Sequence, residues 1–262
     1  MSFVGVDVGA ATAKAVILNG EGLSQHFFVM PTGHDVKLAA EEVLRRVLAK
    51  AGLAGETPDC VFSTGYGRNA VPFAQKAVSE IICHAKGAFA LDPATRAIID
   101  IGGQDSKVIQ VNETGRVVDF VMNDKCAAGT GRFLEVIAGV LNMNLEELGP
   151  KALLSSEPCQ ITSTCTVFAE TEVVSLRAQG STRKDIVAGI HRAVAFRVGV
   201  MARPMNLQRK VMFTGGVAKN MGVKKAIESD LGLELCVPDE PQIIGALWAA
   251  LMARESCLNS QT

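Results

Sequence analysis

Short apolar runs alternate along the chain with longer segments of helical periodicity. Short runs rich in Val and Ile, bounded by Gly, Asp or Asn, predict strands, and amphipathic stretches predict helices. In the first part of the chain the pattern predicts strands at Phe3–Val8, Ala13–Leu18, Gln25–Met30 and Cys60–Thr64, and helices from the cap Asp35 to about Ala51 and at Ser79–Leu91. The predicted order is strand-strand-strand-helix-strand-helix.

A similar order begins again near residue 97. The second part of the pattern predicts strands at Ala97–Ile101, Lys107–Val111, Val117–Met122, Lys210–Thr214 and Glu234–Val237, and helices at Gly131–Leu141, Val167–Gln179, Lys184–Pro204, Ala218–Leu231 and Ile243–Arg254. Because strands and helices are mixed and the order approximately repeats, the sequence predicts an α/β protein with an internal duplication.

Two hairpins of the form D-x-G-x4-K mark this duplication. The first is Asp7–Lys14, and the second, Asp100–Lys107, follows 93 residues later with the same spacing. A single Asp-x-Gly match is common in ordinary turns. Two matched hairpins flanked by apolar β-branched residues indicate two copies of one unit.

Both hairpins have the composition of a phosphate-binding turn. Glycine lets the backbone approach an anion closely, and a tight turn can aim several N–H groups into one concavity. Lys14 can neutralise phosphate charge, whereas Asp7 and Asp100 suit Mg²⁺ held through water. The strand-to-helix turn at Gly215-Gly216 can accept a flat ring and a sugar against bare backbone. The sequence contains neither a Walker A loop nor a complete dinucleotide-binding fingerprint.

Charge and composition exclude several classes of function. The net charge is −1 and no basic block is present, so we expect no nucleic-acid partner. The N-terminus lacks the pattern of a signal peptide, and the apolar stretch Pro241–Met252 is too short to span a membrane. We therefore expect a cytoplasmic chain. The seven cysteines are scattered and include no C-x-x-C, which argues against a disulfide framework or a zinc ribbon.

Several stretches resemble known families. Asp7–Lys14, Asp100–Asp105 and Phe213–Asn220 resemble the phosphate-1, phosphate-2 and adenosine motifs of the actin, sugar kinase and Hsp70 superfamily. Thr64–Asn69, Asn123–Phe133 and Ser163–Glu170 resemble the ATP-dependent activators (component A) of 2-hydroxyacyl-CoA dehydratases, which are related to the ATP-binding subunits of benzoyl-CoA reductase. The resemblance extends over nearly the full length.

The resemblance implies a duplicated actin/ribonuclease H-like fold with two lobes and ATP in the cleft. The expected first lobe is residues 1–95 plus 241–262, and the second, which carries the cluster-ligating helices, is residues 96–240. The expected ATP-binding residues are Gly9, Ala10, Ala11, Thr12, Ala13, Lys14, Gly102, Gly103, Gln104, Gly215, Gly216, Asn220 and Gln242. Gln104 and Asp105 are the candidate catalytic residues, since a Gln can orient an attacking water. Family members usually carry Ser at the position of Ala10, so we expect altered ATP affinity or hydrolysis rather than lost binding.

The resemblance also implies a homodimer with one [4Fe-4S] cluster, bound by Cys126 and Cys165 of each subunit. A cluster held only by cysteines takes four thiolates, so a two-fold dimer completes the set. Both cysteines precede predicted helices, and Ser163-Thr164 are the expected N-cap residues of the second helix. A helix N-terminus favours a thiolate. Cys159 lacks this context and is expected to be a structural or surface thiol, and His191 a packing residue.

ATP binding and hydrolysis would then drive one low-potential electron into a partner iron–sulfur enzyme, a 2-hydroxyacyl-CoA dehydratase, with flavodoxin or ferredoxin as the electron source. An aromatic-CoA reductase or a double-cubane cluster protein is an alternative partner. A small-molecule kinase of the same superfamily is a second alternative, although the sequence offers no good catalytic Asp base. A regulatory ATP-binding module is a third, and in it Cys126 and Cys165 would be replaceable.

Overall fold

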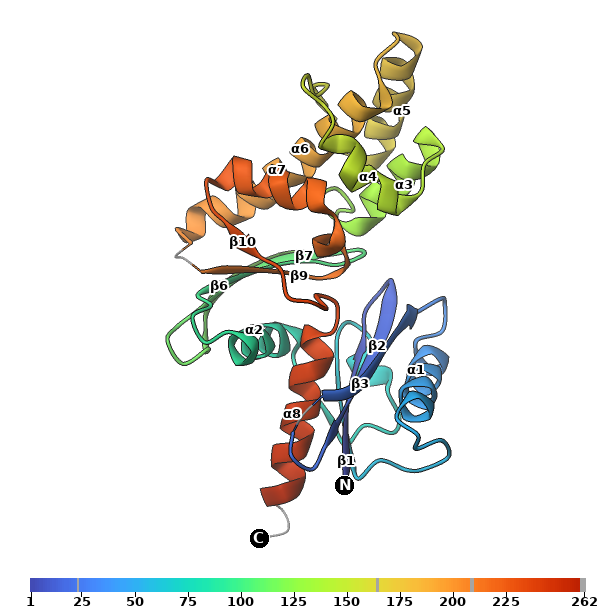
Figure 1. Ribbon diagram of the computed structural model, residues 1–262, viewed down its shortest axis with the longest axis vertical. Coiled ribbons are helices and arrows are strands. Elements are labelled where there is room, and N and C mark those ends of the chain that lie inside the picture. Colours follow the sequence, from blue (N-terminus) through green and yellow to red (C-terminus); the bar gives the residue numbers. More distant parts are fainter. Residues whose placement is uncertain (23, 164, 208–209, 260–262) are drawn as a thin grey trace. The chain divides into compact units, whose positions relative to one another are not determined.

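Two mixed β-sheets with the same strand order organise the chain (Figure 1). The computed structural model describes residues 1–22, 24–163, 165–207 and 210–259. The chain divides into a first unit, Met1–Ala94, Val111–Val117 and Asp239–Thr262, and a second unit, Thr95–Gln110 and Val118–Pro238. Each unit combines one sheet with helices, so the predicted α/β class is confirmed.

The elements of the two units have the following bounds. The first unit has strands β1 (Ser2–Val8), β2 (Thr12–Asn19), β3 (Ser24–Pro31), β4 (Cys60–Thr64) and β5 (Lys76–Ala77), helices α1 (Val36–Lys50), α2 (Glu80–Leu91) and α8 (Ile244–Asn259), and the 3₁₀ turn η1 (Arg68–Ala70). The second has strands β6 (Ala97–Ile101), β7 (Ser106–Val111), β8 (Val117–Asn123), β9 (Val211–Thr214) and β10 (Leu235–Cys236), helices α3 (Gly131–Leu141), α4 (Leu145–Ala152), α5 (Thr166–Ala178), α6 (Arg183–Ala202) and α7 (Met221–Leu231), and the 3₁₀ turns η2 (Arg203–Met205) and η3 (Gly216–Lys219).

The strand order shows the internal duplication directly. The first sheet runs β3-β2-β1-β4-β5, and the second runs β8-β7-β6-β9-β10. In each sheet the central strand is antiparallel to the next strand of the chain and parallel to a strand that follows later. Asp7 pairs with Lys14 on one side and Thr64 on the other, and Asp100 pairs with Lys107 and Thr214 in the same way. The two hairpins are therefore equivalent positions of one repeated unit.

Helices cover both faces of the central strand β1, which explains its continuous apolar sequence. Val4, Val6 and Val8 pack in the cluster that includes α1, and Phe3 packs in the cluster that includes α8. At Gly5 a Cβ atom would overlap the backbone carbonyl of Ala246 in α8. Glycine at this position thus lets α8 lie directly on the sheet.

The core of the second unit forms where helices pack against β6 and β9. Ile99 and Phe213 on the strands contact a cluster that includes Leu134 of α3, Ile190 of α6 and Ile227 of α7. These side chains are at most 2% exposed. Among the described residues, no helix is long and apolar enough to cross a membrane.

The structure departs from the predicted elements in several places, and the short strand β5 is one that was not predicted. Helix α4 was not predicted, because Gly149 and Pro150 disfavour a helix interior. Helix α7 begins at Met221 rather than Ala218, since the turn η3 occupies the intervening residues. Helix α8 continues beyond the predicted end at Arg254 to Asn259.

Candidate functional site

The first hairpin has a turn fixed by backbone hydrogen bonds. Gly9 N donates to Thr12 O (3.0 Å), and Thr32 Oγ1 donates to Gly9 O (2.7 Å). Thr32 N also donates to Ala11 O (3.0 Å), which ties the end of β3 to the turn. A Cβ at Gly9 would lie 3.1 Å from Thr12 O and 3.2 Å from Lys14 Nζ, so a side chain there would crowd the turn.

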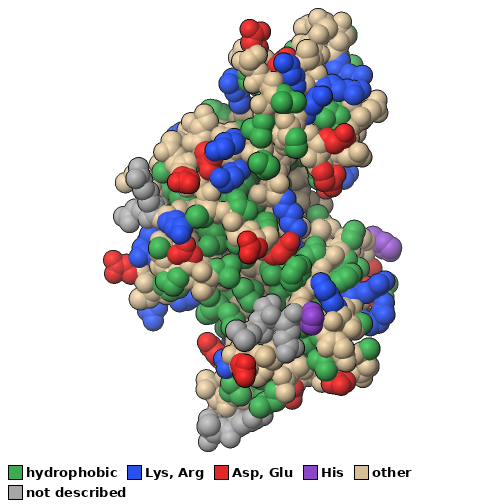
Figure 2. Space-filling model, in the orientation of Figure 1, with side chains coloured by type: hydrophobic (Ala, Val, Ile, Leu, Met, Phe, Trp, Pro, Cys, Tyr) green, Lys and Arg blue, Asp and Glu red, His purple; other side chains and the backbone are tan. Residues whose placement is uncertain are grey.

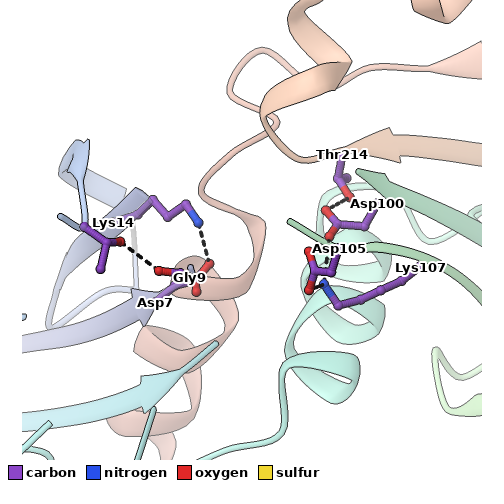
Figure 3. Close-up of polar contacts among 8 residues, drawn as sticks. Asp7, Gly9, Lys14, Asp100, Asp105, Lys107 and Thr214 are labelled. Carbon is purple, nitrogen blue, oxygen red and sulfur yellow. Dashed lines mark hydrogen bonds and ion pairs between the residues drawn. The ribbon is translucent and has the colours of Figure 1, made fainter. Parts of the chain in front are cut away.

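Asp7 lies at the end of β1, buried beneath this turn. Its Oδ2 is 3.4 Å from Lys14 Nζ, as Figure 3 shows, and the residue is 4% exposed. A Cβ at Gly245, in the first turn of α8, would lie 3.2 Å from the same oxygen. The N-terminus of α8 therefore contributes positive potential at the Asp7 carboxylate, beside the Lys14 charge.

The second hairpin is tied to the start of α3. Gly102 N donates to Asp105 O (2.9 Å) and closes the turn, and Gln104 is exposed within it. The carbonyls of Gly102 and Gly103 accept hydrogen bonds from Gly131 N (2.9 Å) and Arg132 N (2.7 Å). The first N–H groups of α3, which have no partner within the helix, are thus satisfied by the hairpin turn.

Beneath the second turn lies a buried ionic cluster (Figure 3). Lys107 Nζ is 2.6 Å from Asp105 Oδ2 and 3.4 Å from Asp100 Oδ2, and the lysine side chain is 3% exposed. Thr214 Oγ1 donates to Asp100 Oδ1 at 2.8 Å. Of the two candidate catalytic residues, Asp105 is therefore ion-paired, whereas Gln104 is exposed.

The strand-to-helix turn after β9 packs its glycine against the second hairpin. Gly215 has φ +85°, and a Cβ there would overlap the carbonyl of Ile101. Asn220 is the N-cap of α7, because its Oδ1 accepts hydrogen bonds from Gly222 N (3.0 Å) and Val223 N (3.1 Å). Gly216 is exposed in η3, and the remaining candidate, Gln242, precedes α8 in the first unit.

Cys126 lies in a short segment between β8 and α3. Asn123 Nδ2 donates to the carbonyls of Cys126 (2.8 Å) and Ala128 (3.3 Å), and Thr130 Oγ1 donates to Ala127 O (2.6 Å). These bonds fix the backbone of the segment while the Cys126 residue remains partly exposed. Helix α3 begins at Gly131, as predicted.

Cys165 is exposed and is itself the N-cap of α5. The expectation that Ser163 caps this helix is wrong, because Cys165 occupies the N-cap position. Ser163 N donates to Glu172 (2.8 Å), and Thr164 lies outside the described residues. Thr162 also donates to Glu172, from N and Oγ1, both at 2.9 Å. Burial acts to raise the pKa of Glu172, but these hydrogen bonds outweigh it and lower the pKa.

Comparison with known proteins identifies the family. Residues 4–253 match the BadF/BadG/BcrA/BcrD ATPase family. The chain belongs to this ATPase family. Its relatives include the 2-hydroxyisocaproyl-CoA dehydratase activator of Clostridioides difficile, at 44% identity over 100% of this chain and 98% of the relative. The solved structure of the Clostridium difficile activator with bound ADPNP matches with a TM-score of 0.95 and 43% identity, over 100% of this chain and 97% of that chain. A subunit of the benzoyl-CoA reductase of Thauera aromatica is 32% identical over 94% of this chain and 91% of its own length.

The cysteines of this BadF/BadG/BcrA/BcrD ATPase differ in exposure. Cys60 and Cys83 are buried, and burial raises the pKa of the Cys83 thiol to about 12. All seven cysteines are free. In the described part of the chain, no three His, Cys, Asp or Glu side chains are grouped so that they could hold a metal ion. A four-thiolate cluster on Cys126 and Cys165 therefore needs thiols from a second copy.

Sequence reasoning did not assign the hydrogen bonds that hold the candidate residues in place. Thr214 and Asn123 lie within motifs named above, but their bonds to Asp100 and to the Cys126 segment were not predicted. Glu172, which accepts from Ser163 N, lies outside those motifs. Cys159 lines a pocket of about 480 Å³ with Gly129, Arg192, Phe196 and Arg197, among other residues of the second unit. Figure 2 shows basic and acidic side chains interspersed on the face that it draws, in keeping with the net charge of −1.

Proposed function

We propose that this chain is an ATP-dependent activator that delivers a low-potential electron to a partner iron–sulfur enzyme, a 2-hydroxyacyl-CoA dehydratase. The observation that carries the proposal is the full-length likeness, at 43% identity and a TM-score of 0.95, to a dehydratase activator solved with bound ADPNP. The two equivalent hairpins support it, because each presents a glycine turn over an Asp–Lys pair.

In this proposal both hairpin turns contact the phosphates of ATP. Their glycines admit an anion to the backbone, and Lys14, at 13% side-chain exposure, offsets phosphate charge. Asp7 and Asp100 fit a water-held Mg²⁺, since each is a carboxylate at the end of a central strand beside a glycine turn. The adenosine contacts are Gly215, Gly216 and Asn220, and Gln242 contributes from the first unit.

Hydrolysis would depend on the tip of the second hairpin. Gln104 is exposed there and orients the attacking water through its amide. Asp105 holds Lys107 with one carboxylate oxygen. We propose that its other oxygen would accept a hydrogen bond from the same water. Because Asp105 is neutralised by Lys107, Gln104 is the residue whose loss should affect hydrolysis most directly.

The nucleotide turn has a direct path to Cys126 within the second unit. Gly102 and Gly103 accept hydrogen bonds from the first N–H groups of α3, and Cys126 lies five residues before that helix. A change in the turn on hydrolysis would therefore move the start of α3 and the segment that carries the thiol. This is the link that we propose between ATP and electron delivery.

We propose that Cys126 and Cys165 from two copies bind one [4Fe-4S] cluster. The thiols fit this group, because both cysteines are accessible and Cys165 is at the N-terminus of α5, where the helix dipole favours an anionic ligand such as the cluster. When bound, such a cluster supplies one electron at low potential. Val167 and Phe168, which follow Cys165, are 67% and 68% exposed, and a homodimer would bury them. Flavodoxin or ferredoxin is the proposed electron source.

Anaerobic purification followed by iron, mass and ATPase measurements tests the function. We expect a brown, oxygen-labile dimer with about four irons, because one four-thiolate cluster needs two chains. Cys126→Ser and Cys165→Ser should lose the iron, whereas Cys159→Ser, the matched control, should keep it. A colourless monomer that still binds ATP contradicts the proposal.

A second candidate is an ATP-dependent component of an aromatic-CoA reductase. The likeness to the benzoyl-CoA reductase of Thauera aromatica favours it, although at 32% rather than 44% identity. The two candidates differ in the acceptor of the electron. ATP-dependent reduction of a purified 2-hydroxyacyl-CoA dehydratase supports the first candidate, and reduction of an aromatic-CoA reductase component alone supports the second.

A further inference from the structure

His191 lies in the middle of α6, 1% exposed, where α6 packs along α7. Its Nε2 atom is 3.4 Å from Nδ2 of Asn220, the N-cap residue of α7. Hydrolysis and electron delivery as proposed above make no use of this imidazole. Asn220, by contrast, ends the turn that we propose as the adenosine contact.

The hydrogen bonds of Asn220 assign the direction of this contact. Oδ1 of Asn220 accepts from Gly222 N and Val223 N, so the amide NH₂ group faces His191. An NH₂ group can only donate, and Nε2 must therefore be the acceptor. This requires a neutral imidazole whose proton is on Nδ1. Burial lowers the pKa of His191 to about 4, so the neutral form is present at neutral pH.

Glycines in two neighbouring helices make the contact close. A Cβ at Gly222 of α7 would lie 2.5 Å from His191 Nδ1, and a Cβ at Gly149 of α4 would lie 2.8 Å from Asn220 Oδ1. The backbone at these two glycines thus approaches the His191 and Asn220 side chains through space that the Cβ atom of another residue would fill. The packing of α4 and α7 therefore holds the imidazole and the amide in register.

We propose that His191 is a positioning residue for the nucleotide turn, because it accepts the hydrogen bond that fixes the Asn220 amide. This inference rests on the proposed function, which takes Asn220 as an ATP contact. Without an acceptor on α6, the amide NH₂ group loses its buried partner, and only the two hydrogen bonds to Oδ1 then hold the Asn220 side chain. The turn Gly215–Asn220 would then be less well ordered for adenosine.

Two substitutions separate positioning from packing. His191→Gln can place an amide oxygen near the position of Nε2, whereas His191→Met fills similar space without a comparable acceptor. We expect His191→Met to raise the Kd for ATP by about three- to tenfold, the effect of one net hydrogen bond, and His191→Gln to restore most of the affinity. Calorimetric titration gives the Kd, and thermal unfolding reports any general loss of structure. Equal affinity in both variants overturns the inference.

A double-mutant cycle tests whether the effect passes through Asn220. In an Asn220→Ala background, His191→Met should cause no further loss of ATP affinity, and additive losses overturn the inference.

For the unaltered protein, ¹⁵N NMR should show His191 protonated on Nδ1. Protonation on Nε2 overturns the inference even if no variant folds. A wild-type chain that binds no ATP contradicts the proposed function and this inference together, whereas wild-type binding that is unchanged by His191→Met overturns the inference alone.

Discussion

At the scale of single residues, the charge on Lys107 balances the buried carboxylate of Asp100 and the partly exposed carboxylate of Asp105. Its Nζ is 2.6 Å from Asp105 and 3.4 Å from Asp100, at 3% side-chain exposure. Lys107→Met leaves those carboxylates without their cation, so we expect the free energy of unfolding to fall by about 3–5 kcal/mol in urea titrations. Lys14→Met is the matched control, because Lys14 pairs with a single carboxylate, that of Asp7, which the N-terminus of α8 also faces. A fall no larger than that of the control contradicts this account of the cluster.

Gln104, unlike Lys107, has a proposed role in hydrolysis and should contribute little to stability. It is exposed in the second turn, so Gln104→Ala should leave the thermal midpoint and the Kd for ATP nearly unchanged. The ATPase kcat should fall at least about tenfold, which is about 1.4 kcal/mol of transition-state stabilisation. Gln110→Ala, on β7 of the same hairpin, is the control. Unchanged turnover in Gln104→Ala would remove Gln104 from the mechanism.

His191 should make stability depend on pH. Its pKa is about 4 in the folded chain, against 6.5 for the free group, because burial penalises the charged form. Between these values the unfolded state binds more protons, so the free energy of unfolding should rise with pH by up to about 3 kcal/mol. His191→Gln should flatten the curve between pH 4 and 6.5. Urea titrations across that range measure it, and equal slopes in both proteins contradict the assignment.

Spacing in the sequence revealed only part of these residue contacts. Asp100 and Lys107 were found because they repeat the offset of Asp7 and Lys14. Thr214 was not assigned to Asp100, since it is 114 residues away and reaches the carboxylate through parallel pairing of β6 and β9. Such contacts depend on the sheet order, which local periodicity does not specify.

At the scale of elements, prediction succeeded where local signals and tertiary packing agree. The bounds of β4, β6 and α3 match the predicted ranges, because apolar runs and glycines mark their ends. Helix α4 was missed, since Gly149 and Pro150 argue locally against it. Tertiary packing explains Gly149, because a Cβ there would lie 2.8 Å from Asn220 Oδ1. The glycine that this close packing requires is therefore also the residue that argued against a helix in the sequence pattern.

The close packing of α8 on β1 yields a prediction at this scale. In Gly5→Ala the new methyl group would overlap the carbonyl of Ala246, which is backbone and cannot rotate away. We expect a loss of about 1–3 kcal/mol in the free energy of unfolding, typical of overpacking in a core. Gly20→Ala is the control, because a Cβ at Gly20 meets nothing within 4 Å. Similar unfolding curves for the two variants would show that α8 tolerates the methyl group.

At the scale of the whole molecule, the duplication divides the proposed activity unequally. Both units carry the Asp–Lys hairpin, but Cys126 and Cys165 are both in the second unit, together with α3 to α7. Helices α3 to α6 lie between β8 and β9, at the point where the first unit has only α1 between β3 and β4. In the proposal, both units share a common nucleotide-binding fold. Only the second unit has the additional helices that place the cysteines for the cluster. Both cysteines were already assigned to the second lobe from the sequence, and the equivalent strands show where the additional helices enter the repeated unit.

The proposed cluster requires a homodimer, because the two cysteines of one copy do not complete a four-cysteine set. Phe168 is 68% exposed, three residues after Cys165, and a second copy would bury it. Phe168→Asp should leave the unfolding midpoint of the single chain nearly unchanged, since an exposed side chain contributes little to it. The mass by light scattering should fall from dimer to monomer, and the iron should be lost with it. Leu38→Asp, an exposed apolar residue on α1, should retain both. An iron-containing dimer of Phe168→Asp would place the interface elsewhere.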